Sequence, residues 1–144
     1  MGMIDLASGN SIWRGIDYLE NHKVISWTSS GNSTYEGTVS GSEGRVYTVH
    51  IDPAHPRKST CNCPFADGRR VICKHMIALY FTAEPKAHKE FMKQVDQWEQ
   101  EEAEREEQHD LELRTYVNSL SKAELRERLY EALVDLENLK DHYW

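Results

Sequence analysis

Apolar residues early in the chain recur at the spacing of a helix. Ile12, Ile16 and Leu19 fall on one face of a helical repeat, and Ser11 stands before them as a candidate N-cap. The pattern stops near Asn21. The sequence therefore predicts a short amphipathic helix whose apolar face must pack against another element.

The segment that follows has the pattern of strands. Three stretches rich in β-branched and aromatic residues, 24–28, 34–40 and 45–51, are separated by turn-like connections rich in Ser and Gly. This arrangement predicts a small antiparallel meander. Because three short strands bury little surface by themselves, the helix before them and the segment after them must cover one face.

Helical spacing returns further along the chain. Residues 72–80 carry apolar side chains three and four positions apart, and the Glu84-Pro85 dipeptide ends this segment. A second apolar stripe spans residues 91–98. Residues 99–110 then carry many glutamates and only one apolar residue. This acidic stretch is either a solvated helix or a mobile connector.

The last segment has the most regular helical pattern. Ser121 and Glu124 form a capping-box pair, which marks a helix N-terminus. The apolar residues that follow share one helical face: Leu125, Leu129, Ala132, Leu133, Leu136 and Leu139. A face this apolar needs a partner, either within the chain or in another molecule.

Together these patterns predict an α+β fold in two regions. Residues 1–84 are expected to form a module with a lead-in helix, a three-stranded antiparallel sheet and a ββα-type zinc finger. Residues 85–144 are expected to form an acidic helical region, as a hairpin or as an extended arm.

Four candidate metal ligands lie just before the helix predicted at residues 72–80. Cys61, Cys63, Cys73 and His75 form a C-x-C-x9-C-x-H arrangement. Residues i and i+2 of an extended segment point to the same side, so Cys61 and Cys63 can reach one ion. Thiolates and imidazole are the ligands that tetrahedral zinc prefers. The sequence therefore predicts one zinc ion held by these four residues.

The loop between the two ligand pairs favours a structural zinc site. Asp67-Gly68 is a turn dipeptide, and Phe65, Val71 and Ile72 are apolar residues that can cover the metal. Four protein ligands leave no coordination position for a substrate, which is typical of structural rather than catalytic zinc. A catalytic thiol at Cys73 would need a base and an orienting group that the sequence does not show. We therefore expect no enzymatic activity and no small-molecule substrate.

The ligand pattern resembles the SWIM zinc finger, whose signature is C-x-C-xn-C-x-H. Arg14-Gly15-x-x-Tyr18, followed by Val24, is similar to the helix that leads into the finger of bacterial SWIM domain-containing proteins. The strand Tyr47-x-Val49-x-Ile51 and the apolar helix behind Cys73-Lys74-His75 also fit. The resemblance covers about residues 11–83, bounded by the predicted helices and strands.

The resemblance implies a ββα zinc module that binds DNA or another protein. It also implies that the four Cys and His residues named above are the zinc ligands. The sequence contains no helicase P-loop, transposase core or kinase loop, the enzymatic parts that accompany the finger in better-known members. Any such activity would have to come from another chain.

Charge is distributed unevenly along the sequence. The formal net charge is -7, but residues 45–93 carry nine basic and four acidic residues, whereas residues 94–144 carry six basic and fifteen acidic residues. The basic residues closest to the predicted finger are Arg57, Lys58, Arg69, Arg70 and Lys74. They form either a phosphate-contacting patch or an ordinary solvated surface that balances the zinc thiolates.

Hydropathy and the N-terminal sequence bear on the cellular compartment. No apolar run is long enough to span a bilayer, and the N-terminus lacks a secretory signal, so the sequence favours a cytoplasmic protein without a membrane partner. Reduced thiols in that compartment more often bind metal than form disulfides.

Two functions remain open from the sequence. The first is nucleic-acid binding, with DNA as the expected partner, through the basic surface around the finger. The second is a protein-interaction adaptor that acts through the C-terminal amphipathic helices. These helices would pair with a second copy of the chain, as a homodimer, or with a larger protein partner. Fold resemblance alone does not choose between them.

Overall fold

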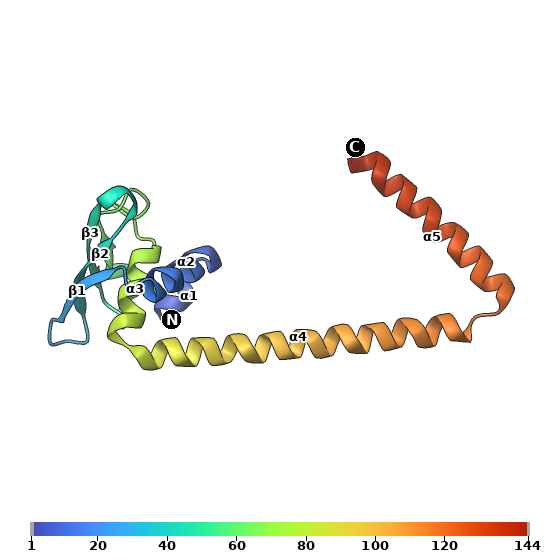
Figure 1. Cartoon of the computed structure of the whole chain (residues 1–144), viewed down its shortest axis with the longest axis horizontal. Coiled ribbons are helices and arrows are strands. Elements are labelled where there is room, and N and C mark those ends of the chain that lie inside the picture. Colours follow the sequence, from blue (N-terminus) through green and yellow to red (C-terminus); the bar gives the residue numbers. More distant parts are fainter. Residues whose placement is uncertain (1, 144) are drawn as a thin grey trace. The chain divides into compact units, whose positions relative to one another are not determined.

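The computed structural model describes residues 2–143, which divide into two compact units (Figure 1). The first unit extends to Lys93 and the second begins at Gln94. The elements in chain order are α1 (Met3–Leu6), α2 (Gly9–Glu20), β1 (Val24–Ser29), β2 (Tyr35–Ser40), β3 (Val46–Ile51), β4 (Thr60–Cys61), α3 (Lys74–Ala83), α4 (Pro85–Ser119) and α5 (Lys122–Tyr143). Two short 3₁₀ helices lie at Ser42–Gly44 and Pro56–Lys58.

The lead-in helix is longer at its N-terminus than the sequence indicated. Ser8, rather than Ser11, is the N-cap of α2, and its Oγ accepts a hydrogen bond of 3.1 Å from the Ser11 backbone N–H. This bond satisfies one of the backbone N–H groups of the first turn, which have no acceptor within the helix. Apolar periodicity begins only at Ile12, which is why the first turn was missed. The structure also adds α1, which no periodic pattern marked.

The sheet has the strand order β1-β2-β3-β4, and every neighbouring pair is antiparallel. Pairing of Gly37 with Val49 and of Tyr35 with Ile51 sets the register of β2 on β3. The sequence predicted three strands. The fourth, β4, is only two residues long and pairs with β3, so no alternating pattern could reveal it.

Helix α3 contributes more buried apolar side chains to the first unit than any other element. Figure 1 shows α3 between the sheet and α2. The side chains of Met76, Ile77 and Leu79 are fully buried there. Helix α2 lies close to α3 at Gly15, where an added Cβ would stand 2.6 Å from the Ile77 side chain. A glycine at this position allows the two helices their close approach.

The first turns of α4 belong to the first unit. Phe91 is buried, its ring stacks on that of Phe81 at 5.9 Å between centroids, and it meets the Trp13 ring at 5.7 Å. These aromatic contacts attach the beginning of α4 to the finger. The division of the chain at residues 84 and 85 remains a prediction from the sequence.

The second unit is helical throughout its described residues, apart from the break between α4 and α5. The acidic stretch at 99–110 lies within α4 and is a solvated helix. The capping box at the start of α5 is present, with the Glu124 backbone N–H donating to Ser121 Oγ at 3.2 Å. The leucines of α5 remain exposed, Leu129 to 61%.

These elements confirm the predicted α+β class, with helices, one small antiparallel sheet and long C-terminal helices. None of the helices in residues 2–143 is both long and apolar enough to cross a membrane.

Candidate metal centre and its surroundings

Strand β4 and the turn after it position the first ligand pair. Cys61 pairs with Val49 in the sheet, and Asn62 extends this pairing because its Oδ1 accepts the Thr48 backbone N–H at 2.9 Å. Cys63 then opens a tight turn in which its carbonyl accepts the backbone N–H of Asp67 at 2.9 Å. The extended backbone places both sulfurs on the same side.

The start of α3 positions the second ligand pair. Cys73 is the N-cap residue, with extended backbone angles, and His75 lies in the first helical turn. The backbone N–H groups of this turn have no partner inside the helix and favour negative charge, so they stabilise a thiolate at Cys73.

The four predicted ligands lie together, with their ligand atoms all within 4.8 Å of one another. Nδ1 of His75 is 3.8 Å from Sγ of Cys61 and 3.8 Å from Sγ of Cys73. Tetrahedral zinc with ordinary bond lengths separates a sulfur from a nitrogen ligand by about 3.6 Å. All four residues are at most 4% exposed. The site therefore fits one structural zinc ion.

The thiols have unequal proton affinities, and Cys73 is the most acidic. The pKa of Cys73 is lowered to about 4, chiefly by its hydrogen bond with Cys61; His75 and the Met76 backbone N–H also lower it, and burial opposes them. The same hydrogen bond raises the pKa of Cys61 above its usual range. Burial, followed by the charge of Cys73, raises the pKa of Cys63. Zinc replaces these protons, because it binds thiolates.

Two tyrosines pack against the histidine ligand. The Tyr47 ring lies 4.7 Å from the His75 ring and the Tyr18 ring lies 5.4 Å from it in an edge-on arrangement. Nε2 of His75 is buried and has no hydrogen-bond partner among the described residues. Sequence spacing did not assign Tyr18 to the metal site; only its place in the lead-in motif pointed to it.

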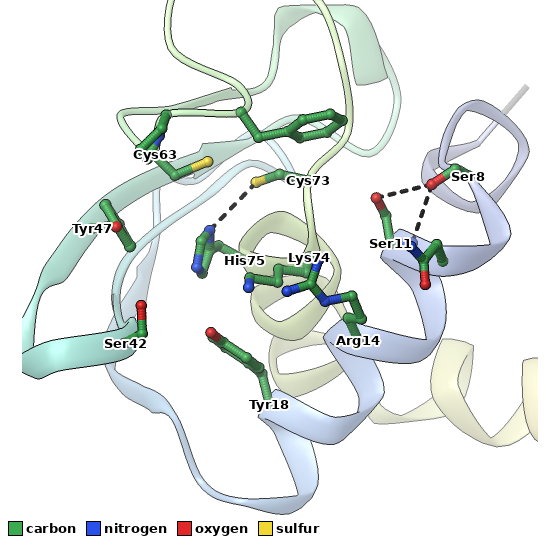
Figure 2. Close-up of a pocket in the computed structure, with 13 residues that line it drawn as sticks. Ser8, Ser11, Arg14, Tyr18, Ser42, Tyr47, Cys63, Cys73, Lys74 and His75 are labelled. Atoms are coloured by element: carbon green, nitrogen blue, oxygen red, sulfur yellow. Dashed lines mark hydrogen bonds between the residues drawn. The ribbon is translucent and has the colours of Figure 1, made fainter.

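The predicted apolar cover over the metal is only partly present. Ile72 is buried, but Phe65 is 49% exposed and Arg69 lies over its ring at 5.2 Å. A cavity of about 320 Å³ reaches Cys63 and Cys73 from the side of α2 (Figure 2).

The structure divides the predicted basic surface into two sites. Arg57, Lys58, Arg69 and Arg70 line one open groove of about 1110 Å³. Lys74 lines the smaller cavity, together with Arg14 of α2. Arg14 was not among the predicted basic residues, because it lies in α2, before the three main strands and far from the finger in the sequence.

Comparison with known protein families identifies a zinc finger in the part of the chain that carries the four ligands. The SWIM zinc finger family model matches residues 47–84, which include β3 except its first residue, and all of β4 and α3. The comparison with curated proteins gave no match. The comparison with solved structures gave none either.

Proposed function

We propose, from the premise that residues 47–84 form a SWIM zinc finger, that the module binds nucleic acid, with DNA as the first candidate, through the groove lined by Arg57, Lys58, Arg69 and Arg70. The observation that supports the proposal is the convergence of these four cations, from two separate segments, on one concave surface.

The groove has the composition of a phosphate-binding surface. Its basic residues are accompanied by Thr48, Thr60 and Asn62, whose side chains can hydrogen-bond to phosphate oxygens, and by one acid, Asp67. None of the four basic residues forms an ion pair among the described residues. Their charges are therefore free to neutralise phosphates, which provides most of non-specific nucleic-acid affinity.

The zinc has an indirect part in this function. Cys61 and Cys63 lie in the sequence between Arg57 and Arg70, which line the groove. A zinc ion bound by the four ligands would therefore fix the position of one segment of the groove relative to the other. We assign no reaction to it, because four protein ligands complete its tetrahedral coordination.

Fluorescence anisotropy of labelled DNA and RNA duplexes and single strands tests the proposal. Arg70→Glu in the zinc-loaded protein should weaken binding and reduce the slope of log affinity against log salt by about one. Lys23→Glu makes the same charge change at an exposed turn outside the groove and is the matched control. No binding by the zinc-loaded wild type at low salt, or equal loss with both variants, would refute the proposal.

A second candidate function is protein interaction through α5, with a second copy of the chain as the partner. The apolar positions 125, 129, 132, 136 and 139 alternate in spacing between four and three residues, which is the seam of a coiled coil. Leu129, Leu136 and Leu139 are each more than half exposed. In a parallel pair, Asp135 and Lys140 would occupy flanking positions that face each other.

Light scattering on the full chain tests this candidate. We expect a dimer that Leu129→Asp converts to a monomer, because the substitution places a charge in the seam. Glu127→Gln, on the opposite face of α5, should leave the dimer intact. A wild-type monomer at high protein concentration would reject the homodimer.

A further inference from the structure

The cavity between α2 and the zinc centre is a second site, separate from the basic groove. We propose that it binds a phosphate monoester, either as a free nucleotide or as the phosphorylated end of a nucleic-acid strand. Its volume of about 320 Å³ lies at the lower end of the range of small-molecule sites. The proposal goes beyond the nucleic-acid function and does not depend on it.

Two cations from different elements face this cavity. Arg14 comes from the middle of α2 and Lys74 from the first position of α3, and both line the cavity (Figure 2). Neither forms an ion pair among the described residues, and no acidic side chain of residues 2–143 lines the cavity. Cys63 and Cys73 also line it, and a zinc centre with three thiolates carries one net negative charge, so the two cations offset that charge and still leave a lining that attracts anions.

The position of Lys74 is fixed by an aromatic ring. Its Nζ lies 4.8 Å from the centre of the Tyr18 ring, which is a cation–π distance. This contact leaves the three ammonium hydrogens without a hydrogen-bond acceptor among the described residues, since the π face does not replace a carboxylate. An anion beside Lys74 would supply that acceptor.

The histidine ligand provides an independent observation. Nδ1 of His75 faces the sulfurs of Cys61 and Cys73, so metal binding at Nδ1 leaves the hydrogen on Nε2. Nε2 is buried in a side chain that is 3% exposed, and it has no partner. Figure 2 shows this nitrogen turned away from Cys73, toward the part of the cavity lined by Tyr18 and Ser42. Zinc ligands of this kind almost always donate their second N–H, commonly to a carboxylate, a backbone carbonyl or water. A bound oxyanion would fill that role here once a shift of the Tyr18 or Tyr47 ring, which both pack on the imidazole, opened Nε2 to the cavity.

The chemistry of the remaining lining selects the class of anion. The hydroxyl-bearing residues Ser8, Ser11, Ser42, Tyr18 and Tyr47 line the cavity together with the two cations. A phosphate monoester offers three acceptor oxygens, which match two cations and several hydroxyl donors better than the two oxygens of a carboxylate do. The Phe65 ring at the rim provides an apolar surface for the group attached to the phosphate.

Calorimetry and NMR on the full-length, zinc-loaded protein test the proposal. AMP should bind and shift the backbone amides of Lys74 and His75 and the Nε2–H resonance of His75, whereas adenosine should not. Arg14→Gln should weaken AMP binding about tenfold or more, because it removes a charged hydrogen-bond donor. Arg105→Gln makes the same chemical change at an exposed position of α4 that lines neither the cavity nor the groove, and it should leave AMP binding unchanged.

Oligonucleotides distinguish the two sources of phosphate. If a 5′-phosphorylated single strand binds more tightly than its 5′-hydroxyl form, and Arg14→Gln removes the difference, the strand end is the ligand. If AMP binds and the two strands do not differ, a free nucleotide is the ligand. The proposal is overturned if AMP causes no shift at His75, if adenosine matches AMP, or if Arg14→Gln and Arg105→Gln have equal effects. Arg57→Gln, in the groove, should weaken the salt-dependent binding of nucleic acid, whereas Arg14→Gln should not. The groove and the cavity are therefore tested separately, and a negative result for one does not decide the other.

Discussion

At the scale of single residues, the two nitrogens of His75 have different tasks. Nδ1 faces two thiols at 3.8 Å and completes the zinc site, whereas Nε2 is buried without a partner beside the cavity. The C-x-C-x9-C-x-H spacing predicted which residues would converge, because each pair lies on a short extended or turn segment. It could not predict which ring nitrogen meets the metal, since Tyr18 and Tyr47 orient the ring from distant parts of the sequence.

Gly15 is the residue whose replacement should most directly disturb the packing of α2 on α3. In Gly15→Ala the new Cβ would stand 2.6 Å from the Ile77 side chain and 2.9 Å from the Lys74 carbonyl oxygen. We expect a loss of about 1–3 kcal/mol in the free energy of unfolding, despite the better helix propensity of alanine. Urea denaturation of the zinc-loaded protein measures it. Gly9→Ala, in the same helix with nothing within 4 Å of its new Cβ, should not destabilise the protein.

At the scale of elements, periodic patterns predicted the positions of the long helices and the three main strands. Features fixed by single hydrogen bonds or by tertiary contact were missed. Ser8 caps α2 through one bond to Ser11, and β4 exists only because Thr60 and Cys61 pair with β3. The division of the basic residues between groove and cavity depends on how α2 packs, which spacing around the finger does not encode.

The N-terminus of α5 tests how much a capping box contributes to an exposed helix. Ser121→Ala removes the acceptor for the Glu124 backbone N–H and should cost the helix about 1 kcal/mol. Amide hydrogen exchange should therefore speed up in the first turn of α5. Ser121→Asp keeps a capping oxygen and should preserve protection. If alanine and aspartate exchange alike, the cap does not stabilise this helix.

At the scale of the whole molecule, the two units differ in what stabilises them. The first has a small sheet, a buried helix and a metal centre, whereas the described part of the second exposes most of its apolar side chains. Zinc binding by small Cys and His sites contributes about 10–16 kcal/mol, as much as the total stability of a typical domain. The ion is therefore part of the folding free energy of the first unit rather than an addition to a stable fold.

Removal of the metal should consequently unfold the first unit. A strong chelator is expected to abolish the near-ultraviolet circular dichroism of the packed aromatic rings, such as Phe81 and Tyr47, and zinc should restore it. Amide hydrogen exchange reports on individual elements. Protection in β2, β3 and α3 should disappear together when zinc is removed, because these elements share one core. Exchange in α5 should change little, because its described side chains form no part of that core. A zinc-free protein that keeps protection in α3 would mean that the sheet and helix fold without the ion and that the metal only orders the loop between Cys63 and Cys73.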